Sequence, residues 1–463
     1  MSGCDTQTMA IALDGGYPDE EPWDSFAGQH GFAPSRQGLE PPGERLFSLT
    51  DPHLRAPAKI ERDSRAWQFT GTAPYQVSAD ALAARLPDIK SFDARLIKGS
   101  FVHVAANAGP AMEHFYSRLF VRYPEIRSMF PHAMREHMER VFAALTRVVW
   151  SIDSPDSLAS CLGELGRGHR KFGVKDRHYE PFLALFLETV RHFNGHYWTD
   201  ETQAAWEAAL AHVSSAMRAA AEQDAAHQPS WWLGEVVQHD QRSQDLAILT
   251  IRPDQPLRYT PGQYLAVQVP RWPRVWRNFS IANAPRENGL IDLHVRAVPG
   301  GLVSGSLVHN TGLGDTVLLG QAGGEMTACA DPGRDLLCVA GGTGLAPLKA
   351  IIEAVIAADR PGKRKKITLF FGARTEDGLY DLADLRVLEW IYPALTVIPV
   401  VSDEPSYDGI KGMLPEVAAL HTSLDDTDIL ISGPDLMVAR AVTLLAGRVQ
   451  PGQIRHDPPD AAR

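Results

Sequence analysis

An arginine and a serine flank an aromatic residue in a β-rich part of the chain, at Arg277, Phe279 and Ser280. A guanidinium forms charge-assisted hydrogen bonds with phosphate, a phenyl ring can cover a flat ring system, and a hydroxyl can donate a hydrogen bond at its edge. The segment 300–304 adds two glycines for close backbone approach and a hydroxyl suited to a phosphate. Its candidate contacts are Gly301, Val303 and Ser304. These residue types predict a flavin site; the alternative is a surface arginine beside an ordinary strand.

A glycine-rich loop, residues 341–347, lies between the apolar segment 336–340 and a helical pattern. A helix that begins after such a loop favours phosphate at its N-terminus. The segment 432–434 follows another apolar run, and in an open α/β sheet both loops would lie at the carboxyl ends of their strands, where ligands bind. We therefore expect a nicotinamide-dinucleotide site. Its candidate contacts are Gly341, Gly342, Thr343, Gly344, Gly433 and Pro434.

One histidine is placed to bind a haem iron, which needs an imidazole ligand and an apolar cage. His169 ends a predicted helix, before the segment 171–174 and the next helix. His137 and Val141 fall four residues apart on one face of another helix, and Tyr116 carries a hydroxyl on an otherwise apolar helical face. We expect His169 to be the proximal ligand and Tyr116 to line the distal side. The alternative for Tyr116 is a packing role, with its hydroxyl bonded to a backbone carbonyl.

Four regions position these residues. Residues 1–90 are rich in proline, glycine and charge, which predicts a disordered or weakly ordered tail. Residues 91–228 have helical periodicity and predict an all-α domain. Short strands with turn signals over 229–331 predict an antiparallel β-barrel. Strands alternate with helices over 332–463, which predicts a doubly wound α/β domain.

The composition limits the classes of partner. The net charge of −11 disfavours nucleic acid, and no apolar run is long enough for a transmembrane segment. The 4 cysteines have no CxxC spacing, so we expect a reducing, cytoplasmic location. A partner of the tail stays unknown at this stage.

The C-terminal half resembles the ferredoxin-NADP-reductase-like superfamily over residues 232–457. The matching segments are 259–264, Arg277–Ser280, 341–347, 371–374 and 432–434. The resemblance implies that Tyr264 contacts FAD and that Arg374 lies in a nicotinamide loop. Arg374 could meet the 2′-phosphate of NADPH, but the residue is common at that loop, so NADH and NADPH both stay open.

The helical half resembles the globin domain of flavohaemoglobins over residues 91–225. The resemblance makes Tyr116 the distal tyrosine, Phe130 a haem-packing residue and His169 the proximal ligand of haem b. It makes Tyr179 the residue that orients His169. His137 stands at the usual distal glutamine position.

Two other positions depart from the family pattern. Ala221 aligns with the family's proximal glutamate, and Glu222 is one residue away. Without an acid at the proximal histidine, the iron would be less electron-rich. The segment 454–459 has prolines where the family has an aromatic over the flavin.

The combined resemblance implies an enzyme. Electrons would pass from NAD(P)H through FAD to haem, and nitric oxide and O2 would be converted to nitrate, with Tyr116 and His137 near the O2. One alternative is a haem-flavin oxidase or reductase acting on peroxide, lipid or quinone. The other is a non-enzymatic gas sensor, which the intact reductase motifs disfavour.

Overall fold

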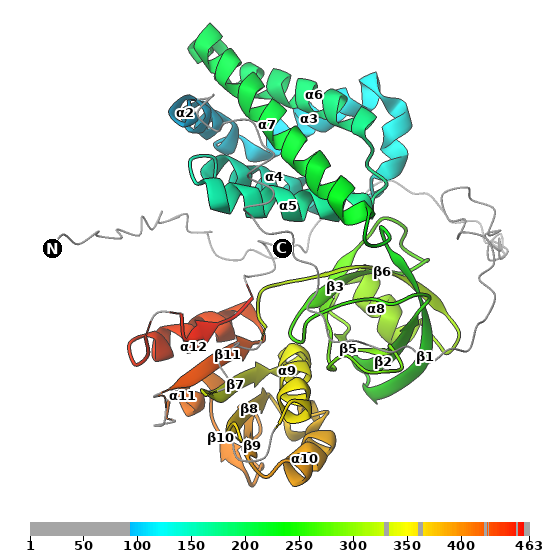
Figure 1. The fold of residues 1–463 in the computed structure, drawn as a ribbon, viewed down its shortest axis with the longest axis vertical. Helices are drawn as coiled ribbons and strands as arrows, with labels where there is room; N and C mark the ends of the chain where they lie inside the picture. The colour runs from blue at the N-terminus through cyan, green and yellow to red at the C-terminus, as the bar shows by residue number, and fades with distance from the viewer. Residues whose placement is uncertain are drawn as a thin grey trace, which may run out of the picture. The chain divides into compact units, whose positions relative to one another are not determined.

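A computed structural model of the 463-residue chain describes residues 93–327, 333–359, 364–420, 424, 426–450 and 452–457. The predicted tail, residues 1–90, lies outside the described residues. Within the described residues, helices α2 to α7 come first, an antiparallel sheet with one short helix follows, and an α/β region follows that (Figure 1). This order is the predicted fold class.

The helical domain is built from amphipathic helices, two of which have a side-chain cap at the N-terminus. Asp93 accepts a hydrogen bond from the Arg95 amide at 2.9 Å, and Thr199 accepts one from the Thr202 amide at 3.2 Å. Asp176 is the first residue of its helix, where a carboxylate is favourable. The helices are α2 (Ala94–Ala105), α3 (Ala108–Arg122), α4 (Arg135–Trp150), α5 (Pro155–Arg170), α6 (Asp176–Asn194) and α7 (Asp200–Ala225), with the 3-10 turns η2 (Pro124–Met129) and η3 (Gly195–Tyr197).

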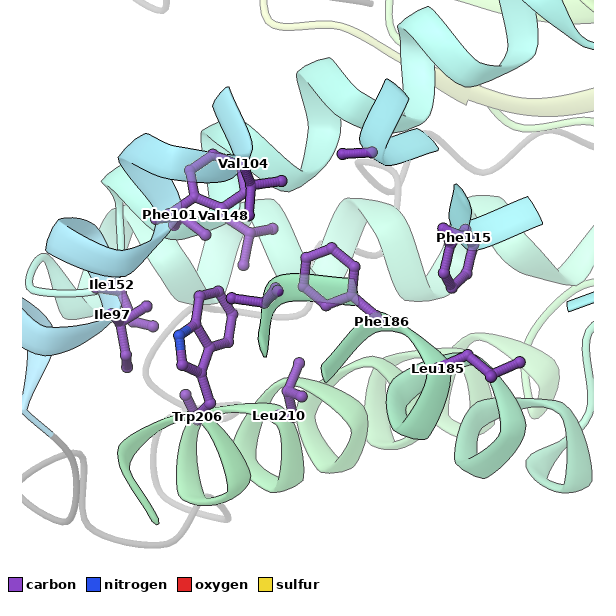
Figure 2. Close-up of a cluster of buried hydrophobic side chains, with 14 of the residues drawn as sticks. Ile97, Phe101, Val104, Phe115, Val148, Ile152, Leu185, Phe186, Trp206 and Leu210 are labelled. Carbon is purple, nitrogen blue, oxygen red and sulfur yellow. The ribbon is translucent and has the colours of Figure 1, made fainter. Parts of the chain in front are cut away.

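The apolar faces of these helices meet in one core, part of which is drawn in Figure 2. Phe101 on α2 and Trp206 on α7 are 0% and 2% exposed, and Phe186 on α6 lies 5.8 Å from Trp206, ring centre to ring centre. The Trp206 indole N–H donates to the Ser100 hydroxyl at 2.8 Å, so the polar atom of this buried ring has a partner. The core fixes α3 to α6 around the predicted haem pocket.

The next domain is a six-stranded antiparallel sheet in the order β4-β3-β6-β1-β2-β5. An isolated bridge between Ile281 and Leu293 joins the end of β4 to β5, which closes the sheet into the predicted barrel. The barrel encloses the buried cluster that includes Trp232, Leu249 and Leu265. The elements are β1 (Trp232–Ser243), β2 (Leu246–Pro253), β3 (Tyr264–Gln268), β4 (Arg277–Ser280), β5 (Ile291–Arg296), α8 (Leu302–His309) and β6 (Thr316–Gly323).

The last domain is a parallel sheet in the order β10-β9-β8-β7-β11-β12. Along β7, Leu336 and Cys338 join the cluster of α9 and α10, while Leu337 and Val339 join the cluster of α11 and α12. Helices therefore cover both faces, as in a doubly wound fold. The elements are β7 (Asp335–Gly341), η4 (Gly342–Gly344), α9 (Leu345–Ala357), β8 (Ile367–Ala373), η5 (Glu376–Gly378), α10 (Leu382–Ile391), β9 (Leu395–Val401), β10 (Ile410–Lys411), α11 (Leu414–Ala419), β11 (Thr427–Ser432), α12 (Asp435–Ala446) and β12 (Ile454–Arg455).

Candidate functional site: haem pocket and dinucleotide sites

The distal side of the predicted haem pocket is an aromatic cluster that contains one hydrogen bond. Tyr116 on α3 is 3% exposed, and its hydroxyl lies 3.0 Å from Nε2 of His137 on α4. Phe130, which follows η2, packs edge-on against both rings, with ring centres 5.6 Å from Tyr116 and 5.2 Å from His137. The structure thus brings together three predicted residues from separate elements.

Burial sets the protonation of this pair. Desolvation lowers the pKa of His137 to about 4, with Arg140 adding repulsion, and desolvation raises the pKa of Tyr116 well above its usual range. At neutral pH the imidazole is therefore neutral and the phenol protonated. The packing-only alternative placed the Tyr116 hydroxyl on a backbone carbonyl; its described partner is His137.

The proximal side is formed by His169, in the last turn of α5. Its Nδ1 lies 2.5 Å from the Leu165 carbonyl oxygen, one turn earlier in the same helix. A carbonyl can only accept, so Nδ1 carries the proton and Nε2 is the nitrogen suited to a metal. Burial lowers the pKa of His169, which also favours the neutral ligand form. These donors fit a haem iron.

No carboxylate reaches His169 from the two neighbouring acids of α7. Glu222 is exposed, and Asp224 is buried but forms an ion pair with Arg170. Asp224 also accepts from the Gln228 side chain at 2.6 Å and from the Gln321 side chain at 3.1 Å. The hydrogen bond at His169 therefore comes from a neutral carbonyl, which gives the imidazole less anionic character than a glutamate would.

Tyr179 lies on α6 and packs against the helical core. Its ring is under the Arg218 guanidinium, 5.8 Å from the ring centre, and burial raises the pKa of its hydroxyl. Among the described residues no hydrogen bond joins Tyr179 to His169. Its orienting role stays a prediction. Val141 is half-buried on α4, one turn after His137, and packs against the helical core; its contact with haem stays a prediction.

The predicted flavin residues lie on two paired strands of the barrel. Tyr264 on β3 is directly opposite Ser280 on β4, and Phe279 is opposite Leu265. Arg277 donates to the Trp276 carbonyl at 3.0 Å and forms an ion pair with Glu136 at the start of α4. The pairing explains how Tyr264, distant in sequence, joins the motif.

The second predicted flavin segment is the turn that leads into α8. Gly301 is the N-cap residue, and a Cβ there would lie 2.5 Å from the Ser304 hydroxyl, so the close turn requires glycine. The Ser304 hydroxyl accepts a hydrogen bond from the Val298 amide at 3.4 Å. Val303 is 1% exposed in the barrel core, so only its backbone can contact a cofactor.

The two predicted nicotinamide loops meet because β7 and β11 are neighbours in the sheet. A Cβ on Gly344 would lie 2.3 Å from the Ser432 carbonyl oxygen, and a Cβ on Gly341 would lie 3.2 Å from a Pro434 side-chain carbon. Only glycine allows the two loops to approach each other so closely. As a result, backbone rather than side chains lines the N-terminus of α9. This cradle of two loops at the carboxyl ends of strands fits a dinucleotide.

The remaining loop residues take different places around this cradle. Gly342 and Thr343 form the η4 turn, and Gly433 has a positive φ of 154°. Arg374, at the end of β8, is 89% exposed on its side chain and lies 4.0 Å from Asp403. The Arg374 side chain is therefore accessible to a bound dinucleotide. The choice between NADH and NADPH stays open.

Sequence reasoning missed two groups of residues. Lys171 lies over the rings of Phe172 and Trp276, 5.3 Å and 5.4 Å from their centres, beside the two predicted cofactor motifs. A buried cluster around Asp381 was also missed, because its members come from four separate segments.

Three family models match consecutive parts of the chain. They are Globin over residues 113–217, Oxidoreductase FAD-binding domain over 234–327 and Oxidoreductase NAD-binding domain over 338–443. Each range lies inside one predicted domain, while the exact domain boundaries stay a prediction. In the described part of the chain, no helix is long and apolar enough to cross a membrane.

Curated relatives match the reductase half or most of the chain. The xylene/toluene monooxygenase electron transfer component XylA of Pseudomonas putida is 33% identical over 205 residues, which cover 43% of this chain and 57% of that protein. This chain thus spans little more than half the length of that relative. The flavohemoprotein of Rhizobium meliloti is 26% identical over 371 residues, which cover 73% of this chain and 90% of that protein.

A solved structure has the same fold across the three domains. The flavohemoglobin from Malassezia yamatoensis, with bound FAD and heme, superposes with a TM-score of 0.66 at 16% identity and covers 78% of this chain and 97% of that chain. The three matched family models give the same order of domains along this chain. The chain therefore has the three-domain fold of a flavohaemoglobin, in which a globin domain for haem is followed by an FAD-binding and an NAD-binding oxidoreductase domain.

Proposed function

We propose that this protein is an NAD(P)H-dependent nitric oxide dioxygenase. For each NAD(P)H oxidised, two nitric oxide and two O2 molecules would be converted to two nitrate ions, with one proton released. When bound, nicotinamide supplies hydride, flavin divides it into single electrons, and haem accepts electrons and binds O2. The observation that carries the proposal is the part-buried hydrogen bond between Tyr116 and His137 in a globin domain that is joined to a reductase.

The distal pair can hold O2 through a proton that stays on the phenol. The pKa of Tyr116 is raised by burial, so its hydroxyl donates at physiological pH. His137 is neutral and can accept from Tyr116 at 3.0 Å or turn to offer its own N–H. Phe130 and the other rings exclude water, which strengthens any hydrogen bond to O2 in the pocket.

Electrons would pass through the domains in the reverse of their order along the chain, from the NAD-binding domain through the FAD-binding barrel to the globin domain. Arg277 and the α8 turn would hold the FAD phosphates, and the Gly344 loop would hold the dinucleotide phosphates at α9. Tyr264 and Ser280, paired across β3 and β4, would lie along the flavin ring.

Nitrate formation tests the proposal directly. The purified holoprotein is given NAD(P)H and nitric oxide, with and without O2, while a nitric oxide electrode follows consumption and nitrate is measured at the end. We expect consumption that needs O2 and gives nitrate in equal amount. If the protein oxidises NAD(P)H with an artificial electron acceptor but forms no nitrate from nitric oxide and O2, the dioxygenase activity is refuted. The protein would then be an electron-transfer protein.

Peroxide is a second candidate acceptor, because His137 stands where the family has glutamine. A neutral imidazole can take and return a proton, which a glutamine amide cannot do at neutral pH. NAD(P)H oxidation driven by hydrogen peroxide, lost in His137→Gln while nitrate formation persists, would favour this second activity.

A further inference from the structure

A cluster of charged and polar side chains connects the FAD-binding barrel to the NAD-binding domain. The barrel contributes one residue from β1 and one from β5, and the NAD-binding domain contributes residues from α9 and from the start of α10. They are Arg242, His294, Lys349, Tyr380, Asp381 and Asp384.

Asp381 is the buried centre of this cluster. Its side chain is 0% exposed, and Oδ2 accepts a hydrogen bond from Lys349 Nζ at 2.6 Å. The other oxygen, Oδ1, lies 3.9 Å from an Arg242 guanidinium nitrogen and has no hydrogen-bond partner among the described residues. One carboxylate thus stands between a cation of each domain.

Arg242 contacts the start of α10 at two points and is itself held by a residue of its own strand. Its guanidinium donates to the Tyr380 carbonyl at 3.2 Å and to Asp384 at 3.1 Å, while Asp240 on its own strand fixes its Nε at 2.7 Å. A fork of fixed donors that engages several acceptors allows one orientation of the partner surface.

A second contact of the same kind lies beside it. His294 Nδ1 on β5 is 2.7 Å from the Tyr380 hydroxyl, and both side chains are less than a tenth exposed. Burial lowers the pKa of His294 well below its usual range, so the ring is neutral. The cluster therefore contacts the barrel through both β1 and β5.

An apolar contact lies between the same two domains. Leu246 and Ile248 of β2 belong to the buried cluster of α9 and β7, and a Cβ on Gly262 would lie 2.8 Å from Ile351. Apolar burial holds the domains together but is non-directional. The directional contacts of Arg242 and Asp381 must therefore set the orientation of the NAD-binding domain relative to the barrel.

Stability alone does not account for the buried charge. Desolvation raises the pKa of Asp381 to about 6 despite Lys349, which means that burial disfavours the ionised form. Buried ion pairs often add little stability over apolar replacements. A function in orientation explains why a costly carboxylate stands at this junction.

We propose that Asp381 is a positioning residue for hydride transfer, which fixes the NAD-binding domain on the FAD-binding barrel through Lys349 and Arg242. The inference rests on the proposed electron path from NAD(P)H to FAD and is independent of the final acceptor. Asp381 would act through the contact between the domains and not by touching either cofactor.

The test is Asp381→Asn in the full-length holoprotein, which keeps the side-chain shape and removes the charge. Anaerobic stopped flow measures the rate of flavin reduction by NAD(P)H. Steady-state turnover is measured separately, with ferricyanide as the electron acceptor. We expect kcat to fall about tenfold to a hundredfold, the range for a misplaced reacting group. KM for NAD(P)H, FAD content and haem content stay within about twofold. An unchanged kcat, or a loss of FAD in parallel with kcat, would overturn the inference.

Two further variants separate positioning from general damage. Arg242→Lys keeps the charge but loses the fork, so we expect a smaller fall in kcat with the protein still folded. Glu235→Gln is the control: Glu235 lies on the same strand and pairs with Arg252 at 3.1 Å, but both side chains are half-exposed. We expect no change in that variant, and a fall equal to that of Asp381→Asn would contradict a specific role.

A pH profile distinguishes positioning from a purely structural role. The charged groups facing Asp381 are Lys349 from α9, Arg242 from β1 and Asp384 from α10, with the His294–Tyr380 pair next to them. Protonation of Asp381 below about pH 6 breaks its ion pairs, so flavin reduction in the wild type should slow there. Asp381→Asn should lack this step, and a step that persists in the variant would assign it to another group.

Failure of this inference differs from failure of the proposed function. A protein that reduces ferricyanide normally but forms no nitrate leaves the role of Asp381 open to the same measurements. A wild-type holoprotein whose flavin is not reduced by NAD(P)H overturns both.

Discussion

The hydroxyl of Tyr116 and Nε2 of His137 are 3.0 Å apart inside a partly buried aromatic cluster, and they come from different helices, α3 and α4. The contact couples the two polar groups of the distal pocket. Removing either one leaves the other without its described partner, and a buried polar group without a partner is costly. The two side chains must therefore be tested as a pair.

Tyr116→Phe should speed O2 release about tenfold or more, because a neutral hydrogen bond contributes roughly 0.5–1.5 kcal/mol and more in a dry pocket. Nitric oxide consumption should fall in the same variant. Stopped-flow measurement of O2 dissociation in Tyr116→Phe and His137→Ala decides between the two residues. An unchanged rate in the first with a large change in the second would assign the role to His137.

His169→Ala should lose stoichiometric haem and keep FAD, because His169 ends α5 with Nδ1 already bonded to the Leu165 carbonyl. Haem and flavin are quantified from the visible spectrum of the purified protein. His196→Ala, an exposed histidine of η3, is the matched control and should retain both. A normal haem spectrum in His169→Ala would show that another residue binds the iron.

Arg277→Ala should weaken FAD binding by about one to two decades, since losing one charge-assisted contact costs roughly 1.5–3 kcal/mol. Reconstitution of the FAD-free protein, followed by flavin fluorescence, gives the affinity. Glu136→Gln removes the ion pair between Arg277 and α4 but keeps the arginine. It therefore separates the effect of that ion pair from the effect of the contact with the FAD phosphates. Flavin retention in Arg277→Ala equal to that of the wild type would refute the phosphate role.

Gly166→Ala should destabilise the globin domain, because its Cβ would lie 2.2 Å from the Met217 carbonyl oxygen where α5 crosses α7. Such overpacking costs about 1–3 kcal/mol. Gly99→Ala on α2 is the control: no atom lies within 4 Å, so the gain in helix propensity should stabilise by about 0.5–1 kcal/mol. Thermal unfolding followed by the helical circular dichroism signal compares the two, and equal shifts would contradict the close approach.

The pH dependence of stability should differ between the wild type and Asp381→Asn. The folded-state pKa of about 6 is above the ordinary 3.8, so the folded chain binds more protons than the unfolded chain between those values. The contribution of Asp381 to the free energy of unfolding is therefore present at low pH and lost as pH rises through 6. Between pH 5 and 7 the wild type should lose about 1 kcal/mol relative to the variant. Urea unfolding, monitored through the release of flavin, gives the free energy of unfolding of both proteins at each pH. If the two free energies change with pH in parallel, the pKa of Asp381 is not raised.

The sequence alone determined the fold class and the main cofactor motifs of this protein. Local signals explain this success: the apolar period of α3, the strand and glycine loop that end at Gly344, and the helix end at His169 are all readable over short windows. Strands β10 and β12 cannot be read in this way, because each is only two residues long and its pairing depends on a neighbouring strand.

Only the tertiary structure decided which side chains meet. The hydrogen bond between Tyr116 and His137, the carbonyl partner of His169 and the ion pair of Asp224 with Arg170 each depend on how two segments pack. The same holds for Asp381, whose two cations come from positions 242 and 349. Periodicity assigns a residue to a face of its own element but does not say what the face meets. Packing of distant segments supplies that information, because burial and partner distance together set the chemistry of each group.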